Sequence, residues 1–157
     1  MADKSTAIHD LMRGYEQFRA PLEALDDGAY GETWLGEWNL SQLLAHMAGW
    51  YREMTAAIAR TSRGERPTPA GVDYSDADAW NAIFAKEAQA GRSALADFDA
   101  AYAGYLAAAR GLPEELFGLA AEGGRPLIGN RLLQGAGVGH FEEHQAELTA
   151  WIESRRK

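Results

Sequence analysis

Apolar residues recur at steps of three and four along two long stretches of this chain, and this period most constrains its fold. The stretches run from about Lys4 to Asp26 and from Asn39 to about Ser62. Their apolar positions are Ile8, Leu11, Met12, Tyr15, Phe18, Leu22 and Leu25, then Leu40, Leu43, Leu44, Met47, Trp50, Met54 and Ile58. Such steps match the turn of an α-helix and not the alternation of a β-strand. The sequence therefore predicts two long amphipathic helices.

The remainder of the chain also favours helices, because alanine and leucine are frequent and β-branched residues are sparse. We expect a short helix over Asp76–Ala90 capped by Ser75, a helix over Ala94–Arg110 capped by Ser93, and a last helix from Pro126 to Ser154. Prolines and glycines between Thr61 and Tyr74 predict a long crossover connection. The fold class is therefore all-α.

Two segments interrupt this helical pattern. Pro21 should bend the first helix or begin its end, and Asp27–Trp38 is expected to be a loop because it holds three glycines and no period. Three more glycines lie in Gly135–Gly139, where each one costs a helix roughly 1 kcal/mol relative to alanine. They indicate either close helix packing or room for a ligand, and packing is the simpler interpretation.

Length, charge and composition narrow the function classes. At 157 residues the chain should form one domain, residues 1–157. No export or membrane-spanning run is present, so we expect a cytoplasmic protein without a membrane partner. The absence of cysteine excludes a disulfide framework, a thiolate metal site and a cysteine nucleophile. A net charge of −8 argues against binding to nucleic acid.

Three histidines carry the chemistry that the sequence suggests. His140 and His144 lie four residues apart on the predicted last helix, so both imidazoles leave the same face. His46 on the second helix could supply a third nitrogen from a facing element. Three neutral nitrogen ligands would leave a position open for water or substrate, as in catalytic metal sites. The alternatives are a hydrogen-bonded core histidine at position 46 and a solvated histidine pair on the last helix.

Neighbours of these histidines on the helical faces complete the predicted site. Trp50 and Glu53 share the face of His46, and Glu147 shares that of His140. Glu53 and Glu147 could accept imidazole N–H groups, orienting the ligands, or serve as general bases. The residues expected to shape the pocket are Trp50, Tyr51, Ala136 and Gly137. Glu143 is assigned to solvent, and Asp78 to a helix N-terminus.

At this point the chain resembles a known family, the DinB superfamily. Trp38–Trp50 resembles the signature of its second helix, and Pro126–Trp151 resembles its last helix with the motif H-[YF]-x-x-H. Trp80–Phe84 resembles the start of an extra helix in the DfsB/ClbS branch. The three motifs occur in the family's order and together touch nearly the whole chain.

The resemblance implies a four-helix bundle with a long crossover between helices 2 and 3 and an extra short helix. It implies a divalent metal, such as zinc, nickel or manganese, held by His46, His140 and His144. Relatives include thiol transferases that use mycothiol or bacillithiol, a maleylpyruvate isomerase domain, and ClbS-type resistance proteins. Relatives are often homodimers. Where the branch often has polar residues before the first histidine of the last helix, this chain has Ala136–Gly139.

These observations predict a metal-dependent hydrolase or thiol transferase that acts on a small electrophilic or strained molecule. An external low-molecular-weight thiol would replace water as nucleophile in the transferase, since the chain has no cysteine. One alternative is a metal-free protein that binds and sequesters a toxic small molecule. Another is a ClbS-like cyclopropane hydrolase without metal. Association with DNA is a weaker alternative because of the acidic charge.

Overall fold

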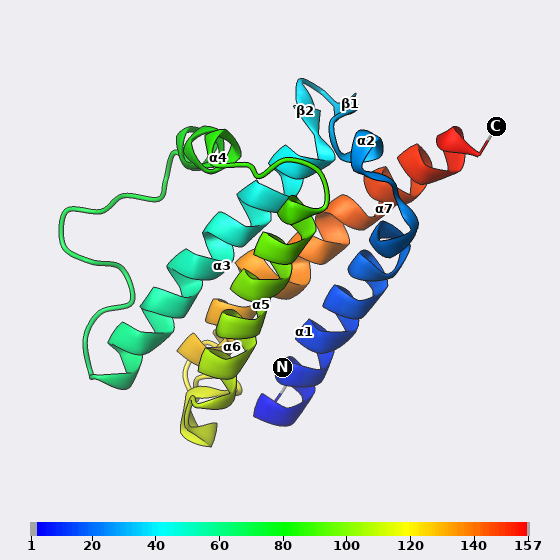
Figure 1. The fold of residues 1–157 in the computed structure, drawn as a ribbon. Helices are drawn as coiled ribbons and strands as arrows, with labels where there is room; N and C mark the ends of the chain where they lie inside the picture. The colour runs from blue at the N-terminus through cyan, green and yellow to red at the C-terminus, as the bar shows by residue number, and fades with distance from the viewer. Residues whose placement is uncertain (1–2, 157) are drawn as a thin grey trace.

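The computed structural model describes residues 3–156 and confirms the all-α four-helix bundle. Four long helical segments run side by side (Figure 1). They are α1 (Lys4–Arg19), α3 (Leu40–Ser62), α5 (Ser93–Arg110), and a last segment made of α6 (Ile128–Leu133), η3 (Gln134–Val138) and α7 (Gly139–Arg155). Within these described residues, no helix combines the length and the apolar character that a membrane crossing requires.

Helix α3 is the central element of the bundle, and its start is fixed by a capping box. The Asn39 side chain accepts a hydrogen bond from the backbone N–H of Gln42 at 2.9 Å, and the Gln42 side chain accepts one from the N–H of Asn39 at 2.9 Å. The predicted N-cap at Asn39 is therefore confirmed. Nearly every residue from Leu40 to Gly49 is buried, because α3 packs against both α5 and α4 (Ala77–Lys86).

The region after α1 contains more structure than the sequence predicted. Pro21 ends the α-helix as expected, but the chain continues as a 3₁₀ helix, η1 (Ala20–Ala24), and not as α-helix to Asp26. The expected loop holds a short helix, α2 (Asp27–Tyr30), and an antiparallel hairpin of β1 (Thr33–Leu35) and β2 (Trp38–Asn39). The hairpin is too short to show a strand period, and this is why the sequence did not reveal it.

The crossover between α3 and α5 is confirmed, and it carries α4, which is seen end-on in Figure 1 and packs across α3. Asp76, not Ser75, caps α4 by accepting from the N–H of Ala79 at 3.1 Å, and the helix ends at Lys86 instead of Ala90. The ring of Phe84 lies so close to Gly49 that a Cβ there would be 2.3 Å from Phe84 Cγ. Glycine at this position therefore lets α4 approach α3.

Other predicted helix ends shift by one or two residues. Helix α5 begins at Ser93 without a side-chain cap, so the capping prediction for Ser93 is wrong. The connection from α5 to the last helix contains a short 3₁₀ turn, η2 (Glu114–Leu116). Pro126 lies in this connection, in a β-bridge with Leu119, and the last helix begins two residues later, at Ile128. Leu127 lies at the N-cap position instead.

The glycine-rich stretch of the last helix is a π-helix, η3. Its Gly137 packs against the core, where an added Cβ would be 2.8 Å from Leu11 Cδ1 and 2.9 Å from the Tyr105 hydroxyl. The packing interpretation of these glycines therefore holds for Gly137. A π-helix has more residues per turn than an α-helix. It therefore changes which residues of α6 and α7 lie on the same face, compared with one continuous α-helix.

Candidate metal centre

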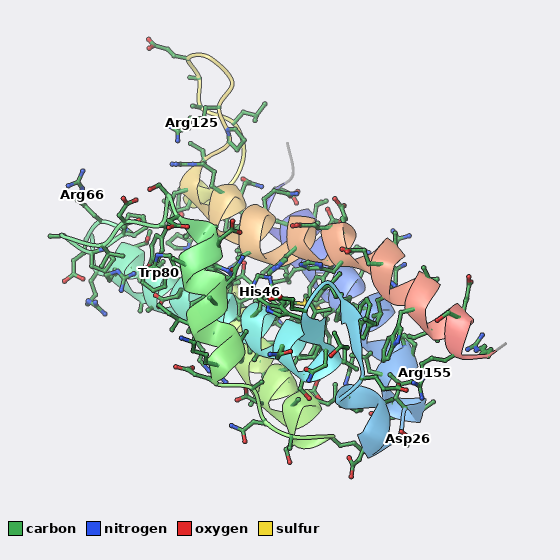
Figure 2. The ribbon with its side chains drawn as sticks, turned by 90° about the horizontal axis from the view of Figure 1, so that it is seen from above. Asp26, His46, Arg66, Trp80, Arg125 and Arg155 are labelled. Atoms are coloured by element: carbon green, nitrogen blue, oxygen red, sulfur yellow. The ribbon has the colours of Figure 1, made fainter. Side chains whose placement is uncertain are left out.

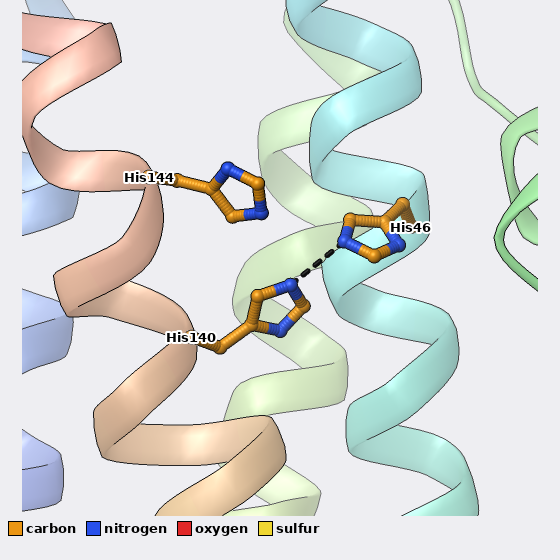
Figure 3. Close-up of side chains that lie close together, drawn as sticks. All are labelled: His46, His140 and His144. Carbon is orange, nitrogen blue, oxygen red and sulfur yellow. Dashed lines mark hydrogen bonds between the residues drawn. The ribbon is translucent and has the colours of Figure 1, made fainter. Parts of the chain in front are cut away.

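Three histidine side chains converge in the interior of the bundle. His46 comes from α3, and His140 and His144 come from α7, one turn apart (Figure 3). All three are buried, with exposed fractions of 5%, 6% and 8%. One ring nitrogen from each can be chosen so that all three lie within 4.8 Å of one another. The structure thus brings together the three histidines that the sequence predicted.

The rings of His46 and His140 are in direct contact. Their Nε2 atoms lie 2.7 Å apart and share a hydrogen bond, whose direction depends on the tautomers. The hairpin covers this pair from outside, because the Trp38 ring on β2 lies 5.3 Å from the ring of His46. A hairpin that the sequence analysis missed therefore forms one side of the centre.

The protonation state of the histidines suits metal binding. Burial, with a smaller contribution from the neighbouring histidines, lowers the pKa of His46 to about 4 and the pKa of His140 to about 3. Both imidazoles are therefore neutral near pH 7. A neutral imidazole offers a lone pair, which is the form that ligates zinc and similar ions.

An unpartnered nitrogen tests whether this centre fits a metal. Among the described residues, Nε2 of His144 is buried without a hydrogen-bond partner and faces the rings of His46 and His140 (Figure 3). Buried polar atoms rarely remain unpartnered in a folded protein, because each lost hydrogen bond costs about 1–3 kcal/mol. This nitrogen, beside the Nε2 atoms of the neutral imidazoles of His46 and His140, therefore fits a divalent ion that prefers nitrogen ligands.

One of the two predicted carboxylates reaches the histidines. Oε1 of Glu147 lies 3.3 Å from Nδ1 of His144, which favours the tautomer with hydrogen on Nδ1 and the lone pair on Nε2. Glu53 is placed differently: its Oε2 accepts a hydrogen bond from the Tyr74 hydroxyl at 3.0 Å. The structure therefore supports Glu147, and not Glu53, as a direct partner of a ligand.

A cavity of about 560 Å³ opens onto the three histidines. Besides them, it is lined by Trp38, Trp50, Met54, Tyr74, Ala77, Asp78, Asn81, Arg131, Gly135, Ala136 and Glu143. Trp50 and Ala136, two of the residues expected to shape the pocket, are thus part of its lining. The volume lies in the range of small-molecule sites in proteins.

Two predicted pocket residues lie elsewhere. Tyr51 is fully buried in the core, where its ring stacks on Tyr105 with centroids 5.4 Å apart. Gly137 faces Leu11 and Tyr105, and Gly135 lines the cavity in its place. A regular step of about 100° per residue from His140 predicted Gly137, but the π-helix before α7 breaks that step.

Several cavity residues were missed because they belong to segments distant in sequence. Tyr74 and Asp78 reach the histidines only through the path of the crossover, and Trp38 only through the hairpin. Glu143 was assigned to solvent, although it stands one turn after His140 on the same helix. That spacing was the available indication for Glu143.

Hydrogen bonds fix the side of the cavity formed by the crossover and α4. The Trp50 indole Nε1 donates to Oδ1 of Asn81 at 2.7 Å, which ties α3 to α4. The rings of Trp50 and Tyr74 meet with centroids 5.6 Å apart. Seen from above, His46 lies near the middle of the molecule, and Trp80 belongs to the green helix α4 beside it (Figure 2). These contacts hold the crossover and α4 against α3 and so fix the shape of this side of the cavity.

The family model described as mycothiol maleylpyruvate isomerase N-terminal domain matches residues 11–126. The matched range contains His46 and ends before His140 and His144. No curated protein matches the chain.

Three solved structures share the fold along almost the whole chain. The colibactin self-resistance protein ClbS, in complex with double-stranded DNA, is 11% identical with a TM-score of 0.80, over 96% of this chain and 95% of that one. DfsB, described as a sibling lethal factor precursor, is 15% identical with a TM-score of 0.80, over 100% and 99%. An uncharacterised protein from Escherichia coli UTI89 is 10% identical with a TM-score of 0.82, over 99% and 96%.

Proposed function

Since the chain belongs to the mycothiol maleylpyruvate isomerase N-terminal domain family and has the DinB-like fold of ClbS and DfsB, we propose that it is a metal-dependent enzyme. Its substrate would be a small electrophilic or strained molecule, consistent with a detoxification or self-resistance role. The observation that carries this proposal is the convergence of three buried histidines at one cavity.

The residues that would hold the ion are His46, His140 and His144. A bound divalent ion would supply a Lewis acid that polarises an electrophilic group of the substrate. Zinc, nickel and manganese are the ions to test; imidazole nitrogens suit zinc and nickel best and bind manganese most weakly of the three. A site with three protein ligands keeps a position open for substrate.

The protein's own groups provide orientation and proton handling. Glu147 would keep the His144 proton on Nδ1, so that Nε2 of His144 faces the other two histidines with a lone pair free to bind a metal. The rings of Trp38, Trp50 and Tyr74 exclude water from one side of the cavity. No side chain of this protein can supply a thiolate, because there is no cysteine.

The nucleophile is therefore water or an external low-molecular-weight thiol. With a strained three-membered ring, the nucleophile's oxygen or sulfur forms a bond to a ring carbon and one ring C–C bond breaks. The proton of the nucleophile ends on the carbon that leaves with the electron pair, so that water or thiol adds across the broken bond. Glu147 does not line the cavity, so its part would be to orient His144 through Nδ1 and not to carry that proton.

The test is turnover of electrophile panels, including cyclopropanes and epoxides, with water alone and with added thiol. Zinc-, nickel- and manganese-loaded protein should form many products per chain. The activity should be lost in His140→Ala and retained in His9→Ala, because His9 lies exposed on α1 away from the centre. Products that stop at one per chain in every combination would contradict catalysis.

One observation favours a second candidate, metal-free sequestration. The 2.7 Å contact between Nε2 of His46 and Nε2 of His140 satisfies two nitrogens without any ion. The cavity could then hold a toxic small molecule through hydrogen bonds and ring contacts. Protection that saturates at one molecule per chain, unchanged by a chelator, distinguishes this candidate from the enzyme.

DNA binding is a further function to consider, because the ClbS structure is a complex with double-stranded DNA. We do not extend it to this chain, since a net charge of −8 opposes a phosphate backbone. A binding titration against duplex DNA at moderate ionic strength tests this point. Salt-dependent binding there would contradict the exclusion.

A further inference from the structure

The cavity is asymmetric in what it offers to a ligand. Its buried part is made of the three histidines, and its exposed part carries charged groups from different helices. We define the aromatic wall as Trp38, Trp50 and Tyr74, and the rim carboxylates as Asp78 on α4 and Glu143 on α7.

The polar atoms of two members of the aromatic wall are already occupied. The Trp50 N–H donates to Asn81 at 2.7 Å, and the Tyr74 hydroxyl donates to Glu53 at 3.0 Å. A ligand at this wall therefore meets the aromatic rings and not a free N–H or O–H of these two residues. Aromatic rings attract apolar groups, and their faces attract cations, tryptophan most strongly.

The rim carboxylates are available to a ligand. Both side chains are exposed, and within residues 3–156 neither forms a hydrogen bond or ion pair. One cation also lines the cavity, Arg131, whose Nε donates to the Pro126 carbonyl at 3.1 Å. Two carboxylates against one guanidinium leave the entrance net negative, and the chain's charge of −8 adds to the attraction of cations.

We propose that the cavity takes ligands with a protonated amine or quaternary ammonium group on an apolar body. The cation would lie between the aromatic wall and the rim carboxylates, and the apolar body would extend toward the three histidines. This inference deepens the proposed function by naming the substrate class. The cation's contacts involve none of the three histidines, so the two proposals can fail separately.

The test uses three probes of similar size at pH 7: phenethylammonium, neutral 2-phenylethanol and anionic 3-phenylpropanoate. Each is titrated into the chelator-treated full chain while the tryptophan indole N–H resonances are followed by NMR. We expect phenethylammonium to shift the Trp50 resonance and to bind about tenfold more tightly than 3-phenylpropanoate. One cation–π contact and two exposed ion pairs together are enough to account for a difference of this size. Equal affinities for the three probes would overturn the proposal.

Variants separate local recognition from overall charge. The double variant Asp78→Asn with Glu143→Gln should weaken phenethylammonium binding about fivefold and leave 2-phenylethanol unchanged. The matched control is Glu114→Gln with Glu122→Gln, which removes the same charge from exposed positions outside the cavity and should bind normally. Equal weakening in both double variants would overturn the proposal.

Metal content and probe preference are measured on the same native chain, which keeps the two proposals separate. A native chain without metal that still prefers the cation would refute only the proposed function. A native chain that holds metal but shows no preference among the three probes would refute only the inference drawn here.

Discussion

Replacing Gly49 by alanine should loosen α4 and destabilise the protein, although alanine is the better helix former. The new Cβ would lie 2.3, 2.4 and 2.7 Å from Cγ, Cδ1 and Cδ2 of Phe84. Carbon atoms in contact prefer about 3.5–4.0 Å, so the ring must retreat by more than an ångström. Phe84 is 7% exposed and packs on Trp50 with ring centroids 5.3 Å apart, which leaves it little room.

The magnitude follows from two opposing terms. Alanine in place of glycine inside a helix contributes roughly 0.5–1 kcal/mol of stability. Overpacking a core contact typically costs 1–3 kcal/mol. We therefore expect the free energy of unfolding of Gly49→Ala to fall by about 1–2 kcal/mol, and Tm to fall by roughly 2–8 °C for a chain of this size.

Urea denaturation followed by tryptophan fluorescence measures this change. The matched control is Gly104→Ala in α5, where nothing lies within 4 Å of the added Cβ, and this variant should gain about 0.5–1 kcal/mol. In a Phe84→Ala background the Gly49 substitution should lose its penalty, because the clashing ring is gone. If Gly49→Ala is as stabilising as Gly104→Ala, the account of how α4 docks is refuted.

Three other outcomes are expected. Glu147→Gln should weaken metal affinity about tenfold in competition with a chelator, because an amide holds the imidazole N–H less strongly; unchanged affinity would contradict the contact. For the metal-free protein, the free energy of unfolding should fall between pH 7 and pH 5, by up to about 2 kcal/mol for each of His46 and His140. The pKa values of His46 and His140 in the folded protein lie near 4 and 3, below the value of histidine in an unfolded chain. The unfolded chain therefore binds more protons between pH 7 and pH 5, and stability falls as the pH is lowered. A free energy of unfolding that stays constant in urea titrations from pH 7 to pH 5 would refute the buried placement. Tyr51→Phe should stabilise the protein by about 1 kcal/mol, since the buried Tyr51 hydroxyl has no partner among the described residues. Tyr105→Phe should destabilise it by a similar amount, since the Tyr105 hydroxyl donates to the Leu132 carbonyl. Thermal denaturation that ranks the two variants in the opposite order would contradict both assignments.

Local physics explains which parts of the fold could be predicted. The apolar period of α3 and the cap at Asn39 involve residues within one helical turn, so the sequence contains them directly. The pair His140 and His144 follows from one helical step in the same way. The end of α1 at Pro21 follows from the missing N–H of proline.

The remaining site residues depend on long-range placement or on irregular backbone. Across the π-helix before α7, Gly137 faces the core and Gly135 lines the cavity, and no single-residue propensity encodes this irregular backbone. Tyr74 lies in the cavity lining through its contacts with Glu53 and Trp50 on α3, more than 20 positions earlier in the chain. Tyr51 was expected in the pocket with Trp50, but adjacent residues of a helix point about 100° apart. Trp50 lines the cavity, and the Tyr51 ring packs in the core against Tyr105.

The most direct test of the central claim is elemental analysis of tag-free protein, alone and after incubation with zinc, nickel or manganese. We predict close to one divalent ion per chain, lost in both His46→Ala and His140→Ala and retained in His9→Ala. Circular dichroism of each variant controls for folding. A folded native chain that binds none of the three ions, or histidine variants that keep the ion, would contradict the assignment of the three buried histidines as a metal centre.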